Sequence, residues 1–187
     1  MKKALAALRP PWYFVKTYMK SLKGTNMSNK PCIMVPTPIG WLRVTGDESG
    51  IAEVSFMTNP GEPPTEPGTH PPLPLLTEAA AQLSAYFQGR LLAFTLPVVP
   101  IGTSFQCRVW QETRQIPYGH TVSYKWLAER LGQPGASRAV GQALNRNPLA
   151  IIIPCHRVVS SAGRLTGYAG GLTRKQFLLE HENLCNL

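Results

Sequence analysis

Short apolar runs separated by turn-forming residues make up the segment from Cys32 to Met57. The runs read CIMV, WLRVT and IAEVSF, and the stretches between them read PTPIG and GDESG. Apolar runs of this length, bounded by proline and glycine, are typical of strands joined by tight turns. We therefore predict a small antiparallel sheet in this segment.

The pattern changes after Met57. Residues 58–74 hold seven prolines and two glycines, a composition that predicts an exposed linker or loop. An amphipathic helical pattern then begins at Thr77 and ends at Gly89. Residues 31–100 are therefore expected to form an amino-terminal α/β domain that contains the proline-rich loop.

Helical patterns dominate residues 101–187. One expected helix, TSFQCRVWQETRQ, has Thr103 or Ser104 as its N-cap, and a second, SYKWLAERLG, has Ser123. The turn GQPG separates the second helix from a third, ASRAVGQALNR, and such a pair predicts a helix-turn-helix. The expected fold class is α+β: a small amino-terminal β-sheet plus helix domain, followed by a helical, winged-helix-like carboxyl-terminal domain.

The third of these helices consists mainly of small residues. A helix with so little side-chain bulk can bring its backbone close to another surface, and Arg138 is the long charged side chain on it. The alternative is a helix packed tightly on its neighbour, with Arg138 in solvent. The small residues are Ala136, Ser137, Ala139 and Gly141.

The net charge of +9 is unevenly distributed. Residues 1–30 carry seven basic and no acidic side chains, residues 31–100 carry two and six, and residues 101–187 carry ten and four. A basic carboxyl-terminal half is typical of a polyanion partner such as nucleic acid, although many basic domains are simply soluble. No apolar run approaches the roughly 18 residues of a membrane-spanning helix.

Residues 1–30 are expected to be a disordered basic arm. Arg9 interrupts the apolar segment before it reaches the length of an export signal. Translation could also start at Met27, which lies just before the first predicted strand.

The cysteines Cys32, Cys107, Cys155 and Cys185 form no CxxC pair. Neither a disulfide framework nor a zinc site is therefore indicated, and no cofactor is expected. Free thiols suit a reducing compartment, the cytoplasm or, in a eukaryote, the nucleus.

The run AIIIP predicts a buried strand that Pro154 ends, so that Cys155 is presented from a turn. A structural cysteine in the core is the plainer alternative, and it suits Cys107 and Cys185. It suits Cys155 less well, because the polar His156 follows directly.

A nucleophilic thiol needs a base or a positive charge beside it, and a third group to orient the base. His156 is the candidate base, acting directly or through a water. Glu182 is the candidate orienter, at the end of the helix TRKQFLLEHE, which Thr173 is expected to cap. The glycine-rich loop GRLTGYAGG around Tyr168 could line a pocket for a flat polar ligand.

Four stretches together resemble the methylated-DNA:protein-cysteine methyltransferases, the O6-alkylguanine-DNA alkyltransferases. The resemblance is close over residues 101–182 and looser back to about residue 32. A related group of alkyltransferase-like proteins has tryptophan in place of the cysteine, so Cys155 indicates retained chemistry. The stretches are NPLAIIIPCHRVV, LTGYAGG, RKQFLLEHE and IPYGHTVSYKWLAERLGQPGASRAVGQAL.

The resemblance implies repair of DNA by direct reversal. A damaged base is rotated out of the duplex, and Cys155 takes its alkyl group in one irreversible step. His156 would act through water, Glu182 would hold the imidazole, and Tyr168 would assist the departing guanine. The implied partner is double-stranded DNA containing O6-alkylguanine, bound by a monomer, and activity on O4-methylthymine is left open.

The resemblance also assigns roles in DNA binding. Arg138 would fill the place of the rotated base, and Tyr124 would crowd its phosphate. Asn147 would tie the recognition helix to the active-site strand, and Arg157 would serve structure. The small residues Ala136, Ser137, Ala139 and Gly141 would let the recognition helix enter the minor groove, and Ser123 would also bind DNA. The backbone near Val158, Ala169 and Gly170 would recognise the base.

Two other functions fit parts of the pattern. A cysteine hydrolase or acyl transferase could use Cys155 and His156, and it would turn over. A winged-helix module that only binds DNA would not need Cys155.

Overall fold

The computed structural model describes residues 31–57 and 73–184, which belong to one compact unit. The predictions for the basic arm, for residues 58–72 and for Cys185 lie outside the described residues. No helix of the described ranges is long and apolar enough to cross a membrane.

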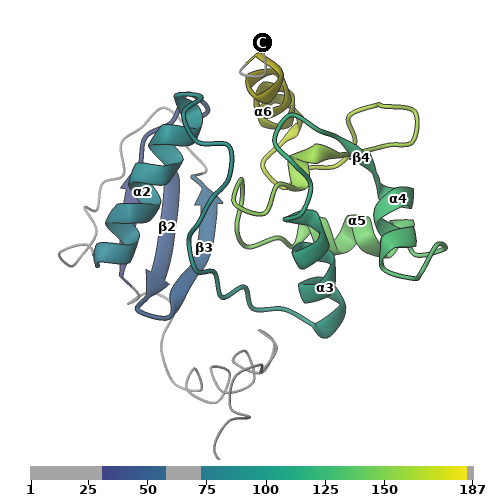
Figure 1. The fold of residues 1–187 in the computed structure, drawn as a ribbon, viewed down its shortest axis with the longest axis horizontal. Helices are drawn as coiled ribbons and strands as arrows, with labels where there is room; N and C mark the ends of the chain where they lie inside the picture. The colour runs from purple at the N-terminus through teal and green to yellow at the C-terminus, as the bar shows by residue number, and fades with distance from the viewer. Residues whose placement is uncertain (1–30, 58–72, 185–187) are drawn as a thin grey trace, which may run out of the picture. The chain divides into compact units, whose positions relative to one another are not determined.

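The amino-terminal part is a three-stranded antiparallel sheet with the strand order β1-β2-β3, as predicted. Its strands are β1 (Cys32–Val35), β2 (Leu42–Asp47) and β3 (Gly50–Phe56). Helix α2 (Pro74–Phe87) lies against the sheet and buries Leu76, Leu83 and Tyr86 (Figure 1).

Helix α2 begins three residues before the predicted start at Thr77. Proline has no N–H to lose and a fixed φ that suits the first helical turn, so Pro74 starts the helix instead of preventing it. Pro74 belongs to the proline-rich stretch of residues 58–74, whose composition predicts a loop, so the start of the helix cannot be recognised from the sequence.

Strand β3 forms backbone hydrogen bonds along both of its edges. One side pairs with β2. On the other, Ile51 N donates to Pro97 O (2.9 Å), and Val54 N donates to Pro148 O (2.8 Å). The segment that leads to Cys155 is thereby bound to the amino-terminal sheet.

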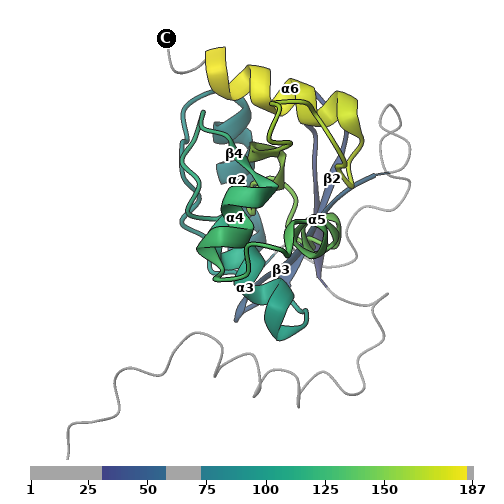
Figure 2. The same ribbon diagram turned by 90° about the vertical axis from the view of Figure 1, so that its right-hand side faces the viewer.

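The carboxyl-terminal part contains the predicted helices. Thr103 caps the first with a full capping box, and the Ser123 hydroxyl accepts from Trp126 N at the start of the second. Thr173 lies inside the last helix and does not open it, because that helix begins at Leu172. This helix lies at the top of both views, above α5 (Figures 1 and 2). The elements are α3 (Ser104–Thr113), β4 (Val122–Ser123), α4 (Tyr124–Arg130), α5 (Ser137–Asn145), β5 (Val158–Val159) and α6 (Leu172–Leu184).

The prediction of a strand over AIIIP is wrong, although the prediction of its burial is right. Leu149 makes an isolated bridge with Val54, and the chain then turns, with Ile151 at φ 71°. Only Ala150 N still bonds to strand β3, at Val54 O (3.0 Å). The following amides bond locally, Ile152 N to Ala150 O and Cys155 N to Ile153 O, both at 2.8 Å. A β-branched residue rarely adopts a positive φ, so the surrounding packing holds this turn.

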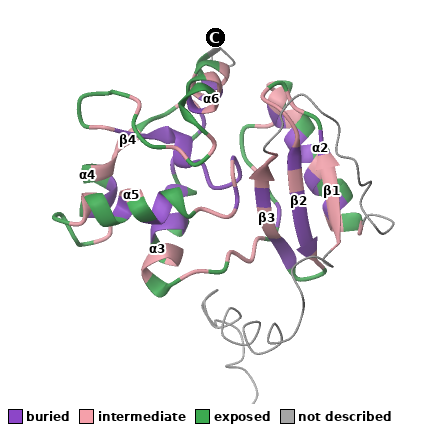
Figure 3. Ribbon diagram, turned by 180° about the vertical axis from the view of Figure 1, so that it is seen from behind, coloured by how far each residue is buried: buried purple, intermediate pink, exposed green. Residues whose placement is uncertain are grey.

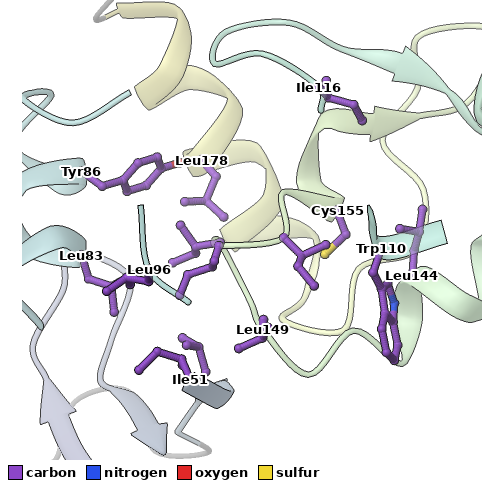
Figure 4. Close-up of a cluster of buried hydrophobic side chains, with 14 of the residues drawn as sticks. Ile51, Leu83, Tyr86, Leu96, Trp110, Ile116, Leu144, Leu149, Cys155 and Leu178 are labelled. Carbon is purple, nitrogen blue, oxygen red and sulfur yellow. The ribbon is translucent and has the colours of Figure 1, made fainter. Parts of the chain in front are cut away.

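A single cluster of buried side chains joins the sheet, the helices and the turn (Figure 3). Trp110 of α3 donates its indole N–H to Ala143 O of α5 (2.9 Å), which connects the helix-turn-helix to the core. Cys155 is a member of this cluster (Figure 4). Its exposed fraction is 7%.

The carboxylate of Glu182, 1% exposed, joins four distant parts of the chain. Arg157 Nε lies 2.9 Å from Oε2, and its Nη2 lies 2.9 Å from Oε1. Tyr86 Oη donates to Oε1 (2.8 Å), and Gly119 N donates to Oε2 (3.1 Å). His156 Nε2 also lies 2.8 Å from Oε1.

Burial opposes ionisation of Glu182, but the hydrogen bonds and positive charge of its partners outweigh burial and lower its pKa from 4.5 to about 2. A carboxyl whose pKa is lower in the folded than in the unfolded protein stabilises the fold above the unfolded value. That stabilisation is lost as the pH falls from 4.5 toward 2.

We expect Glu182→Gln to lower the free energy of unfolding by about 3–5 kcal/mol at neutral pH, because Arg157 is left buried without a counter-charge. The decline of wild-type stability between pH 4.5 and 2 should become shallower in the variant. Denaturant titrations at a series of pH values measure both effects. Glu180→Gln, at an exposed position of the same helix, is the control and should change stability by no more than about 0.5 kcal/mol.

Candidate active site

A cavity of about 420 Å³ opens beside Cys155. Its walls come from strand β3, from the turn that follows Asn147, from the loop at Tyr168 and from the start of α6. The structure thereby brings together Cys155, Asn147, Tyr168, Ala169 and Gly170 of the residues predicted from the sequence.

Cys155 begins a 3-10 turn that extends to Arg157. Asn147, two residues after α5, donates from Nδ2 to Ile153 O (2.9 Å) and lies 3.2 Å from the Cys155 sulfur. Its Oδ1 accepts from Leu149 N (2.9 Å). One amide side chain therefore fixes the turn that carries the thiol and links it to the end of the helix-turn-helix.

Two effects on the thiol oppose each other. Burial raises the pKa of Cys155, and the hydrogen bond from Asn147 and the charge of Lys175 lower it. The thiol is accordingly a weak nucleophile until a base removes its proton or a partner stabilises the thiolate.

Lys175 is the residue that the sequence reasoning missed. Its side chain is 0% exposed, and its Nζ donates to Val158 O (2.6 Å) and Thr166 O (2.9 Å). Burial lowers its pKa, and the neighbouring thiol opposes that shift. The signal was present, because Lys175, Leu178 and Glu182 recur at the spacing of a buried helical face.

His156 is fully buried and bonded to Glu182 through Nε2. An ionised carboxylate only accepts hydrogen bonds, so Nε2 carries the proton and Nδ1 keeps its lone pair. Burial lowers the pKa of His156, so the ring is neutral at neutral pH and Nδ1 is free to take a proton. Within the described part of the chain, Nδ1 has no hydrogen-bond partner.

The Tyr168 hydroxyl is also buried, and none of the described residues bonds to it. Burial raises its pKa well above the ordinary value, so it remains a phenol that can donate a proton or hydrogen bond.

Val158 does not lie where the sequence predicts it, beside the base. It does not line the cavity, because its N–H bonds to Cys155 O and its carbonyl to Lys175.

The outer face of the helix-turn-helix carries the residues predicted to meet DNA. Arg138 and Ala139 are exposed on α5, and none of the described residues forms an ion pair with Arg138. The Tyr124 ring packs against the α5 backbone at Gly141, where an added Cβ would lie 3.7 Å from the ring, and its hydroxyl donates to Thr166 O (3.1 Å).

The other helix-turn-helix residues named from the sequence are less exposed. Ser123 is half-buried, and its hydroxyl caps α4. Ala136 and Ser137 are also half-buried, at the start of α5. In the described ranges, no group of three or more His, Cys, Asp or Glu side chains could hold a metal ion.

Two family models match the chain. The ribonuclease-like domain of 6-O-methylguanine DNA methyltransferase matches residues 32–100, and the DNA binding domain matches residues 104–184. The methylated-DNA–protein-cysteine methyltransferase of Methanosarcina acetivorans is 46% identical over 149 residues, which cover 80% of this chain and 96% of that protein. The same-named protein of Mycobacterium leprae is 47% identical over 151 residues, 81% of this chain and 91% of its own.

A solved structure is also similar. The OGT protein of Mycobacterium tuberculosis, crystallised in complex with DNA, superposes with a TM-score of 0.73 at 42% identity. The match covers 82% of this chain and 93% of the other. The resemblance inferred from the sequence motifs is thereby confirmed, and the chain belongs to the 6-O-methylguanine DNA methyltransferase family.

Proposed function

We propose that the protein repairs duplex DNA by transferring the alkyl group of O6-alkylguanine to the sulfur of Cys155, once per chain. The observation that carries this proposal is the thiol at the edge of a cavity, with Asn147 on the sulfur and the His156–Glu182 pair behind it. Membership of the family and the DNA complex of the relative from M. tuberculosis support DNA as the partner.

The chemistry begins with loss of the thiol proton. His156 Nδ1 takes it through a bridging water, because no direct hydrogen bond joins the imidazole to the sulfur. Glu182, held in place by Arg157, then stabilises the imidazolium, and Lys175 stabilises the thiolate.

The thiolate attacks the alkyl carbon, and the bond between that carbon and O6 breaks. The electron pair of the broken bond stays on the guanine, and the departing guanine takes a proton from the Tyr168 hydroxyl. The proton that His156 removed from the thiol is released to water, and water returns a proton to Tyr168, so that no net proton is gained or lost. The product is a thioether with no leaving group, so each chain reacts once.

A nearly buried sulfur cannot reach a base inside a duplex. The alkylated nucleotide must therefore rotate out of the stack into the cavity, which costs a few kcal/mol. Arg138 occupies the place it leaves, Tyr124 crowds its phosphate, and the small residues of α5 let the backbone approach the minor groove. Ala169 and Gly170 present their backbone to the rotated base. In this proposal residues 101–187 provide both the DNA-binding surface and the nucleophile.

We expect excess methylated duplex to transfer one methyl group per active chain in a single phase. Peptide mass spectrometry should find that methyl on Cys155. Cys155→Ala should abolish transfer and leave duplex affinity within a few-fold, because phosphate contacts come from the helix-turn-helix. Cys107→Ala, at a half-buried thiol that does not line the cavity, is the matched control and should transfer normally. Continued turnover would indicate a hydrolase or acyl transferase instead.

Arg138→Ala should slow transfer from duplex DNA at least tenfold more than transfer from the free base O6-methylguanine, because only the duplex needs its stack held open. Single-turnover rates on the two substrates measure this ratio. Arg90→Ala removes a charge from an exposed position outside the helix-turn-helix and serves as the control. An equal loss on both substrates would assign Arg138 to folding or to the pocket.

Lys175→Met should move the pH profile of transfer from the free base toward higher pH. The positive charge favours the thiolate, so its removal raises the pKa of Cys155 and lowers the reactive fraction at neutral pH. A fall of about tenfold in rate at pH 7 corresponds to about 1.4 kcal/mol of lost stabilisation. Lys175→Arg keeps the charge and should keep the wild-type profile, and thermal melting verifies that each variant is folded. An unshifted profile in folded Lys175→Met would contradict this role.

A further inference from the structure

The guanidinium of Arg174, at the start of α6, binds three separate segments of backbone. Its Nε donates to Ile39 O (3.0 Å) and its Nη1 donates to Gly170 O (3.2 Å). A longer contact of 3.5 Å joins Nη2 to Met57 O. One side chain therefore connects the turn after β1, the end of β3 and the loop that lines the cavity.

The same guanidinium lies over the ring of Phe56, 4.5 Å from its centre. Phe56 is a residue of β3, and it lines the cavity together with Cys155. Its ring meets the Tyr168 ring edge to face, with the centres 6.4 Å apart. The amino-terminal sheet thus contacts the side chain proposed to assist the departing guanine.

Gly170 fits closely between these two rings. A Cβ at this position would lie 2.7 Å from both Phe56 and Tyr168, closer than real Cβ contacts. Its carbonyl is held by Arg174, which fixes the orientation of the peptide that faces the cavity. The loop is therefore held from one side by an aromatic wall and from the other by a charged hydrogen bond.

We propose that Arg174 and Phe56 form a clamp through which the amino-terminal sheet sets the affinity of the cavity for the alkylated base. The inference rests on the proposed function. Arg174 is a positioning residue: it lines the cavity, but its hydrogen bonds and its ring contact go to the backbone of Ile39, Met57 and Gly170 and to Phe56, and the clamp acts through Gly170 and Phe56.

The clamp is separate from the groups that activate the thiol. Lys175 is next to Arg174 in the chain but points to Val158 and Thr166, whereas Arg174 points to the sheet. Loss of the clamp should therefore chiefly weaken binding of the base and leave activation of the thiol unchanged.

The test uses single-turnover transfer from free O6-methylguanine over a range of base concentrations, which separates the half-saturating concentration from the limiting rate. Arg174→Gln should raise the half-saturating concentration about tenfold and leave the limiting rate within about twofold, with an unchanged pH profile. Arg174→Lys keeps the charge over Phe56 but not the three-way fork, and it should give an intermediate value. Arg90→Gln, at an exposed position outside the cavity, should match the wild type.

Phe56→Leu removes the ring without touching the charge, and it should also raise the half-saturating concentration. Thermal melting verifies that both variants are folded. If Arg174→Gln does not fold, Phe56→Leu alone tests the clamp. A lower limiting rate at an unchanged half-saturating concentration, a shifted pH profile, or no change in either variant would overturn the clamp.

A calorimetric titration separates this inference from the proposed function. Binding of O6-methylguanine to Cys155→Ser needs no transfer chemistry, and adding Arg174→Gln should weaken it about tenfold. Wild-type protein that transfers no methyl would refute the proposed function alone. Equal affinity of the single and double variants would refute the clamp alone.

Discussion

The buried carboxylate of Glu182 is the interaction on which the rest of the structure depends. It accepts from Tyr86 of α2, from the Gly119 backbone, from His156 and from Arg157, so that α2, α6 and the turn after Cys155 meet at one charge. Desolvation of such a charge is costly unless every lone pair has a partner, and here the partners are supplied. The same bonds that hold the fold fix the protonated nitrogen of His156, so the stability of the fold and the proposed proton transfer depend on one group.

The position of the thiol reflects a compromise between packing and reactivity. Cys155 belongs to the apolar core, and its burial favours the neutral thiol. Asn147 and Lys175 oppose this with a hydrogen bond and a charge, and neither needs contact with solvent to do so. Under the proposed transfer, the methyl group added to the sulfur would have to fit into this closely packed site.

The amino-terminal sheet forms part of the cavity beside Cys155 and does not merely lie next to it. Strand β3 pairs with the segment that leads to Cys155 through Val54, and residues at its end line the cavity. Arg174 adds a second connection, between α6 and the end of β3. The shape of the cavity therefore depends on contacts from both parts of the described chain. The sheet and the helices that make these contacts also share one hydrophobic core.

The sequence by itself determined most of the elements and the family. Alternating apolar runs, the caps at Thr103 and Ser123, and the cysteine-histidine pair are local signals, and each involves residues a few positions apart. Tertiary structure alone decided the irregular path through Ile151, the burial of Lys175 near the thiol and the partners of Glu182. The carboxylate meets His156 across 26 residues and Tyr86 across 96. Such contacts leave no periodic trace in the sequence, because only the packing of α6 against α2 and the turn at Cys155 brings these residues together.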